Sequence, residues 1–157
     1  MRLTPLAVSD AEALLVVYAD SAMFELTGGS VPTLADLQDR LEQQTGPTPD
    51  GTNWLNWVVR AGDEVVGVTQ ATVKEHGAMA EVAWEIGVPW QGRGYASEAA
   101  TVVVDWMIAQ GVPDIRAHIH PDHAASASVA RAAGLEPTNG WIGGEVIWRI
   151  AAPRAGA

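Results

Sequence analysis

A glycine-containing segment in the middle of the chain, Gln91–Ala96, has the residue types of an anion-binding loop. It reads Gln-Gly-Arg-Gly-Tyr-Ala and lies between a predicted strand and a predicted helix. Gly92 and Gly94 permit tight backbone turns and let a ligand approach the main chain closely. The first N–H groups of the following helix have no intrahelical partners, so they are suited to bind a pyrophosphate. Arg93 could add a positive charge to the site or simply be solvated.

Two carboxylates precede this loop on one predicted strand, Glu81–Val88. Glu81 and Glu85 occupy odd positions, whereas the even positions are apolar and comprise Val82, Trp84, Ile86 and Val88. Successive side chains of a strand point to opposite faces of the sheet. Both carboxylates are therefore predicted to project from the face opposite the apolar residues.

A second group of polar side chains follows later in the chain. His118 and His120 are predicted on one face of a strand, and His123 comes soon after it. With Asp122, three neutral imidazoles could hold zinc. His120 could instead act as an auxiliary base or contact a substrate.

Seven tryptophans raise the question of an aromatic pocket. Trp57, Trp84 and Trp148 fall on predicted strands and are assigned to packing. Trp54, Trp90 and Trp141 lie nearer to loops and are the candidates for lining a pocket.

The elements that must position these groups begin with a strand over 1–6. Ser9 is expected to cap a helix that runs to about Asp20, with Glu12 reaching back to its start. Leu34, Leu37 and Leu41 recur at helical spacing after Thr33 and predict a second helix. Hydrophobic patterning then predicts a three-strand antiparallel meander, a helix, a strand, a short helix and a final strand, over 55–60, 64–73, 81–88, 94–110, 114–120, 124–133 and 145–150.

Length and composition indicate one globular domain over 1–157, with 151–157 as a flexible tail. The chain has 48% hydrophobic residues, yet no apolar run approaches the ~18 residues of a membrane span, and we expect no membrane partner. No secretory signal is visible, so a cytoplasmic location is expected.

A net charge of -10 argues against nucleic-acid binding. Because cysteine is absent, an acyl group cannot be held on an enzyme thiol.

The Gln91–Ala96 segment resembles the acyl-CoA motif of the GNAT superfamily of N-acetyltransferases, which is Gln or Arg, two residues, Gly, one residue, then Gly or Ala. Gln91, Gly94 and Ala96 match it, and the order of elements is similar over most of the chain. The resemblance implies an α+β fold with a mixed, mostly antiparallel sheet of about six to seven strands and about four helices. It also implies acetyl-CoA as acyl donor, an amine as acceptor and no metal.

The stretch from His120 through Ser126 to Leu135 is most similar to the branch that contains the ribosomal-protein-alanine acetyltransferases. Two residues depart from that pattern. His123 stands where asparagine is usual, and Ala130 stands where many relatives carry the tyrosine proposed to protonate the leaving thiolate. The tyrosine mechanism therefore does not carry over to this chain.

The resemblance also implies which residues contact the substrates. Transfer requires an uncharged amine, and Glu85 is the first candidate for the base, Glu81 the second and His120 an auxiliary. Both glutamates lie on the strand that splays from its neighbour in GNAT folds. Ser126 is the candidate proton donor to the thiolate, or else a helix cap. The implied CoA-binding residues are Ile86, Val88, Gln91, Gly92, Arg93, Gly94, Tyr95, Ala96, His123 and Ser126.

These observations predict an N-acyltransferase that moves an acetyl group directly to an amine in a ternary complex. The alternative is a catalytically inert acyl-CoA-binding regulatory module of the same fold. The acceptor could be a protein N-terminus, an amino acid, a polyamine or an aminoglycoside-like drug. The sequence leaves open whether the chain forms a homodimer.

Overall fold

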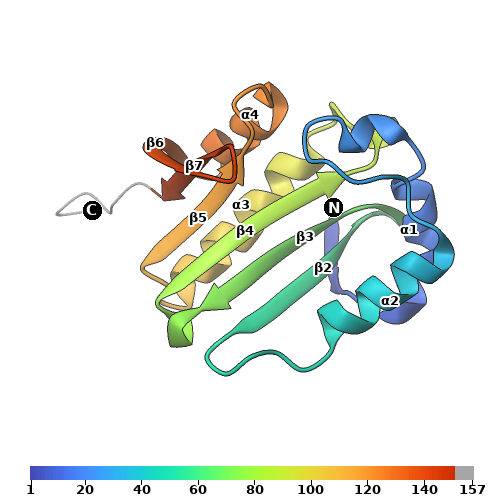
Figure 1. Cartoon of the computed structure of the whole chain (residues 1–157), viewed down its shortest axis with the longest axis horizontal. Helices are drawn as coiled ribbons and strands as arrows, with labels where there is room; N and C mark the ends of the chain where they lie inside the picture. The colour runs from blue at the N-terminus through green and yellow to red at the C-terminus, as the bar shows by residue number, and fades with distance from the viewer. Residues whose placement is uncertain (151–157) are drawn as a thin grey trace.

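A seven-stranded mixed sheet runs through residues 1–150, the part of the chain that the computed structural model describes (Figure 1). The strand order is β1-β2-β3-β4-β5-β7-β6, and only β4 and β5 pair in parallel. The strands are β1 (Arg2–Pro5), β2 (Asn53–Ala61), β3 (Glu64–Lys74), β4 (Met79–Ile86), β5 (Asp114–Ile119), β6 (Leu135–Ile142) and β7 (Glu145–Ile150). The predicted α+β fold is confirmed, whereas the tail expected over 151–157 lies outside the described residues.

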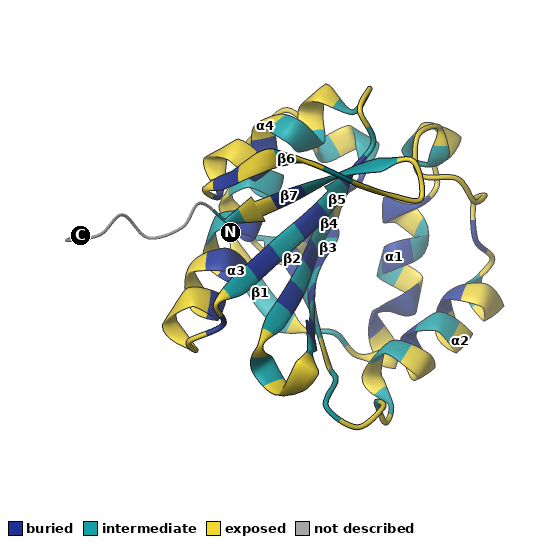
Figure 2. Ribbon diagram, turned by 60° about the vertical axis from the view of Figure 1, so that its left-hand side comes forward, coloured by how far each residue is buried: buried dark blue, intermediate teal, exposed yellow. Residues whose placement is uncertain are grey.

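Helices cover both faces of the sheet (Figure 2). They are α1 (Ala11–Val17), α2 (Leu34–Thr45), α3 (Tyr95–Ala109) and α4 (Ala124–Ala132). Leu14 of α1 and Leu37 of α2 pack with Val58 on one face, whereas Val103 of α3 packs with Ile115 on the other. Within residues 1–150, no helix has the length and apolar character needed to cross a membrane.

The parallel pair at the centre of the sheet is short. Pairing between β4 and β5 covers three residue pairs and ends at Glu81 and Arg116, although both strands continue beyond that point. The two strands therefore diverge toward their carboxyl ends, as the family resemblance implies for the strand that carries the glutamates.

The prediction that Glu81 and Glu85 project from the face opposite the apolar residues of β4 is confirmed. Val82 and Ile86 are buried, whereas Glu85 is exposed and Glu81 is half-buried. Glu85 pairs in register with Val68, which packs against residues of α1 and α2. The carboxylates thus project on the α1 and α2 side of the sheet, and the apolar residues of β4 lie on the α3 side.

The first helix is shorter than the sequence predicts, and its start differs. A 3₁₀ turn, Val8–Asp10, precedes α1, and the helix ends at Val17 rather than near Asp20. Asp10 reaches back, because its Oδ2 accepts a hydrogen bond from the Ala7 N–H at 2.9 Å. Its Oδ1 lies 3.0 Å from Nη2 of Arg60. The expected cap by Ser9 with Glu12 is wrong: the side chain that reaches back at the start of this helical segment is Asp10, which also forms a partly buried ion pair with Arg60 of β2.

Strand β6 was not predicted, because its sequence, Leu-Glu-Pro-Thr-Asn-Gly-Trp-Ile, lacks alternation and contains proline and glycine. Its pairing with β7 is irregular between Pro137 and Trp141. An edge strand tolerates both residues, since only one of its sides needs hydrogen-bond partners.

Candidate active site

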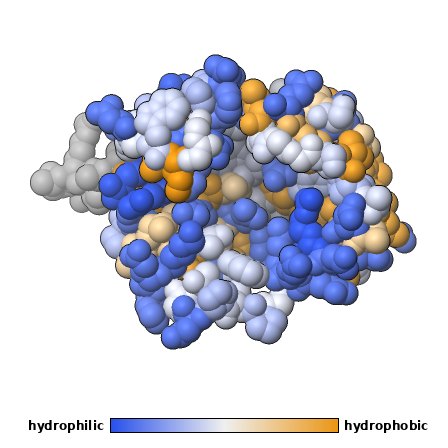
Figure 3. Space-filling view, viewed as in Figure 1, coloured by the Kyte–Doolittle hydropathy of each residue, from blue (hydrophilic) through white to orange (hydrophobic). Residues whose placement is uncertain are grey.

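A cavity of about 750 Å³ opens where β4 and β5 diverge. Its walls come from the ends of β4 and β5, the first turns of α3 and α4, and the connection 22–30 between α1 and α2. The space-filling view shows a hollow between the part of the molecule that carries α1 and α2 and the part that carries α4 and β7 (Figure 3). Ligand sites typically occupy about 300–1,000 Å³.

The glycine loop forms one end of this cavity. Gly92 and Gly94 have φ values of 77° and 85°, a left-handed backbone that favours glycine. A Cβ at either position would meet no atom within 4 Å, so the surrounding space is open to a ligand. Gly94 is the N-cap of α3 and offers no side chain to the first N–H groups of the helix. These groups and the helix dipole together suit a pyrophosphate.

Gln91 links this loop to the strand before it. Its side-chain Nε2 donates a hydrogen bond to the Ile86 carbonyl at 2.9 Å. The motif glutamine thus holds the loop against the end of β4, where the cavity begins.

Most residues with an expected CoA contact line the cavity. These are Ile86, Gln91, Gly92, Gly94, Tyr95, Ala96, His123 and Ser126. Val88 and Arg93 are not among the lining residues. Val88 lies in a 3₁₀ turn, Val88–Trp90, and is half-buried, whereas Arg93 projects from the loop and is exposed.

Glu85 is the carboxylate of β4 that lines the cavity. Beside it lies the buried Tyr18, at the end of α1. Burial raises the pKa of the Tyr18 hydroxyl well above its usual value, and Glu85 raises it further through charge and hydrogen bonding. Arg40 of α2 lowers the same pKa, so Tyr18 lies close to one acidic and one basic side chain.

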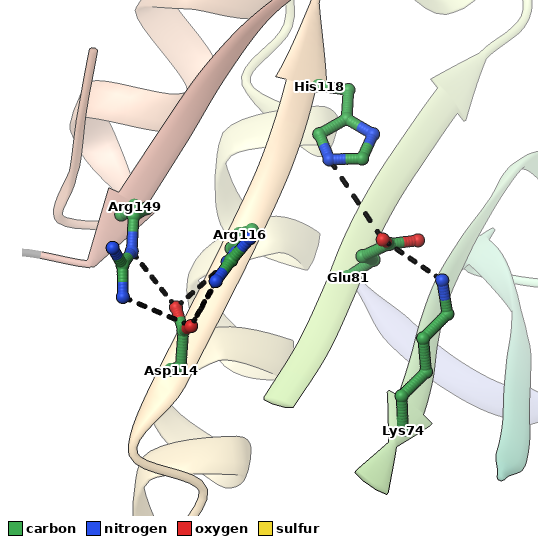
Figure 4. A network of polar contacts seen from close by, with 6 residues as sticks. All are labelled: Lys74, Glu81, Asp114, Arg116, His118 and Arg149. Carbon is green, nitrogen blue, oxygen red and sulfur yellow. Dashed lines mark hydrogen bonds and ion pairs between the residues drawn. The ribbon is translucent and has the colours of Figure 1, made fainter. Parts of the chain in front are cut away.

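Glu81 lies outside the cavity. Its Oε1 is 3.0 Å from Lys74 Nζ and 4.0 Å from His118 Nε2 (Figure 4). On the neighbouring strand Asp114 pairs with Arg116 and Arg149, and hydrogen bonding from Arg116 is the main cause that holds the pKa of Asp114 below its usual value. The Glu81 side chain thus belongs to a surface ion-pair network at the end of β4 away from the glycine loop.

His118 lies on β5 and His120 directly follows the strand; both alternate with the buried Ala117 and Ile119, as predicted, and both line the cavity. His120 Nδ1 accepts a hydrogen bond from the Asp122 N–H at 3.1 Å. The neutral imidazole therefore carries its proton on Nε2. In that tautomer Nε2–H of His120 is a hydrogen-bond donor, and the role of His120 as an auxiliary base stays a prediction. Among residues 1–150, no three histidine or carboxylate side chains are arranged to hold a metal ion.

His123 and Ser126 lie at the first turn of α4. His123 is the N-cap, and its Nδ1 accepts a hydrogen bond from the Ser126 N–H at 3.3 Å. The alternative role of Ser126 as a helix cap is therefore wrong. The Ser126 side chain lines the cavity instead, whereas Ala130, one turn further on, is fully buried.

The tryptophan assignment is correct for Trp90, which lines the cavity, and for Trp148, which is buried. Trp84 is half-buried and packs against the core, as assigned, and it also lines the cavity. Trp54 and Trp141 are exposed and do not line it.

Comparison of the sequence with protein families gives one decisive match. The sequence model described as acetyltransferase (GNAT) domain matches residues 1–136. This chain belongs to the GNAT acetyltransferase family. Its divergent β4 and β5 and its glycine loop before α3 are therefore parts of a GNAT domain. Comparison with curated proteins gives no match.

Several solved structures have the same fold. A GNAT-family acetyltransferase from Bacillus anthracis is 19% identical, with a TM-score of 0.75 over 94% of this chain and 92% of that one. AAC(6')-Ib in complex with ribostamycin and coenzyme A is 17% identical, with a TM-score of 0.76 over 99% and 97%. A spermidine N-acetyltransferase chimera of Vibrio cholerae SpeG is 14% identical, with a TM-score of 0.74 over 95% and 93%.

Tyr18 and Arg40 are the GNAT-domain residues near Glu85 that the sequence analysis missed. For each of them, helical spacing from a buried leucine gives a weak indication of its position. Tyr18 follows the buried Leu14 by four residues, and Arg40 follows the buried Leu37 by three, so each lies on the inward face of its helix. The arginine is the more informative of the two, because a charged side chain is unusual on the inward face of a helix.

Proposed function

We propose that this GNAT domain transfers the acetyl group of acetyl-CoA directly to an amine in a ternary complex. The observation that carries the proposal is one cavity that contains both an uncapped helix N-terminus with open glycines and an exposed carboxylate, Glu85. The first feature fits the pyrophosphate of CoA, and the second fits an amine that must lose a proton.

The Gln91–Ala96 loop and the first turn of α3 would hold the pyrophosphate, and the gap between β4 and β5 would admit the rest of the donor. Acetyl-CoA supplies a thioester, whose carbon–sulfur bond breaks as the amine nitrogen bonds to the acetyl carbon. The family includes structures with acetyl-CoA and coenzyme A bound, which supports this choice of donor.

Glu85 accepts the proton of the ammonium group, either directly or through water, so that the nitrogen can attack. Ser126 donates a hydrogen bond to the departing sulfur, because it faces the cavity and Ala130 offers no donor. Nε2–H of His120 is a further donor on the same wall, which suits contact with the acceptor or the acetyl oxygen. We place this chemistry nearest to the ribosomal-protein-alanine acetyltransferase branch because of the His120–Leu135 stretch.

Release of free CoA thiol from acetyl-CoA in the presence of a panel of amines tests the proposal. We expect amine-dependent release, together with an acetylated product of matching mass. The alternative, an inert acyl-CoA-binding module, would bind acetyl-CoA in calorimetry and release no thiol with any amine.

A further inference from the structure

Within the described residues 1–150, Arg40 is the one arginine or lysine that lines the cavity, beside three histidines and three glutamates. By contrast, most arginine and lysine side chains of the strands are paired. Arg60 lies 3.0 Å from Asp10, and Lys74 lies 3.0 Å from Glu81. Arg116 and Arg149 share Asp114. Among residues 1–150, Arg40 has no carboxylate oxygen within 4.0 Å, so its guanidinium, which contacts Tyr18, has no ion-pair partner.

Arg40 is held beside the proposed base. Its guanidinium carbon lies 5.5 Å from the centre of the Tyr18 ring, a cation–π contact. Tyr18, Arg40 and Glu85 together line a small recess next to the main cavity, and the main cavity also reaches Arg40 and Glu85. A positive and a negative group thus stand close together on the acceptor side of β4, the face that α1 and α2 cover.

The nearby wall is apolar. Met23, Phe24 and Leu26, from the connection after α1, line the same cavity. The Phe24 ring lies 6.3 Å from the Tyr18 ring, so the apolar wall is continuous with the Tyr18 and Arg40 contact. An acceptor bound here meets a carboxylate, a guanidinium and hydrophobic side chains.

This combination distinguishes classes of amine. A guanidinium recognises a carboxylate through two parallel hydrogen bonds, while Glu85 takes the ammonium group. A polyamine or an aminoglycoside has no carboxylate to pair with Arg40, and a positive charge placed beside Arg40 would be repelled. The cavity of about 750 Å³ must also hold part of the acyl donor, which leaves room for a small acceptor.

We propose that Arg40 forms an anion subsite that selects small amines bearing a carboxylate, with apolar amino acids favoured over polycations. The inference rests on the proposed function, since it names the acceptor class of the same site. It assigns to Arg40 a role in specificity rather than in the chemical step.

Matched acceptor pairs test the subsite in the full chain. L-phenylalanine is compared with L-phenylalaninamide, and L-leucine with L-leucinamide, by CoA thiol release in wild type and in Arg40→Gln. Spermidine and kanamycin serve as polycationic acceptors. Arg2→Gln removes an exposed arginine of β1 and is the control for charge loss. An amino acid and its amide differ in intrinsic reactivity. This difference cancels because kcat/KM of the variant is divided by kcat/KM of wild type for each acceptor.

We expect Arg40→Gln to lower kcat/KM for the carboxylate acceptors by about 10-fold to 100-fold more than for their amides, the range for loss of a charge-assisted hydrogen bond. The KM for acetyl-CoA should not change, and Arg2→Gln should behave as wild type. Equal losses for acid and amide, or turnover of the polycations alone, would overturn the inference and leave the proposed function intact. Binding of acetyl-CoA without thiol release for any acceptor would overturn both.

Discussion

The Nδ1 atom of His123 accepts a hydrogen bond from the backbone N–H of Ser126, 3.3 Å away. This contact separates the roles of two neighbouring residues. His123 caps α4 through its imidazole, and Ser126 is left with a side chain that faces the cavity. Stability and turnover should therefore respond to different substitutions within the same helical turn.

Replacement of His123 by alanine should lower the free energy of unfolding by about 1 kcal/mol, because one N–H of the first turn of α4 loses its acceptor. Asparagine at the same position should restore most of the loss, since its side-chain oxygen is an effective N-cap. Urea unfolding followed by circular dichroism measures both values. Equal stability of the alanine variant and wild type would contradict the capping role.

His123 should also make the stability of the protein depend on pH. Burial is the main cause that lowers the pKa of His123 in the folded chain, with His120 adding to the effect. The unfolded chain then binds the proton more readily, so this contribution to stability is present above the unfolded pKa, about 6.5, and is lost as the pH falls below it. The His123→Asn variant should lose less stability than wild type between about pH 7 and pH 5, measured by the same unfolding assay.

Ser126→Ala should slow transfer from acetyl-CoA by about 10-fold to 100-fold, the loss expected for one positioned donor. Because Ser126 is not the cap, the melting temperature should stay close to that of wild type. Turnover per folded molecule and thermal melting are measured together. A stable variant with full turnover would show that water protonates the sulfur.

Glu85→Gln and Glu81→Gln form a matched pair on one face of β4. The first should reduce turnover at neutral pH more than it changes acetyl-CoA affinity, and part of the rate should return at higher pH as the free amine becomes deprotonated. The second should leave turnover within about 2-fold, because Glu81 lies outside the cavity and its ion pair with the exposed Lys74 contributes at most about 1 kcal/mol. Equal effects of the two changes across the pH range would remove Glu85 from the mechanism.

Gly94→Ala and Gly111→Ala compare the two ends of α3. Both glycines have positive φ, 85° and 82°, and both have open space beside the Cα. Each alanine should cost about 1–2 kcal/mol of stability, because an L residue is strained in that region. Only Gly94→Ala should weaken acetyl-CoA binding in calorimetry, since Gly111 lies far from the cavity along the helix. Unchanged affinity of a folded Gly94→Ala variant would show that the pyrophosphate is bound elsewhere.

Local pattern was sufficient for several features of the site. The glycine loop before α3, the common face of Glu81 and Glu85, and the common face of His118 and His120 follow from residue types and from the two-residue period of a strand. The order of the strands and helices followed from the same periodicities, apart from β6, whose sequence carries none. These features depend on neighbours along the chain, and the sequence therefore determined them.

Only the tertiary structure decided which of the equivalent residues belong to the cavity. Glu81 and Glu85 have the same pattern, yet they lie about 13 Å apart along the strand, and the divergence of β4 from β5 begins between them. Tyr18 and Arg40 line one recess with Glu85 because α1 packs on β3, α2 packs on β2, and the two helices pack against each other. Such contacts join residues 45 to 67 positions apart in the sequence. The periodicity of the sequence does not indicate these long-range neighbours, because they arise when the hydrophobic faces of separate elements are buried against one sheet.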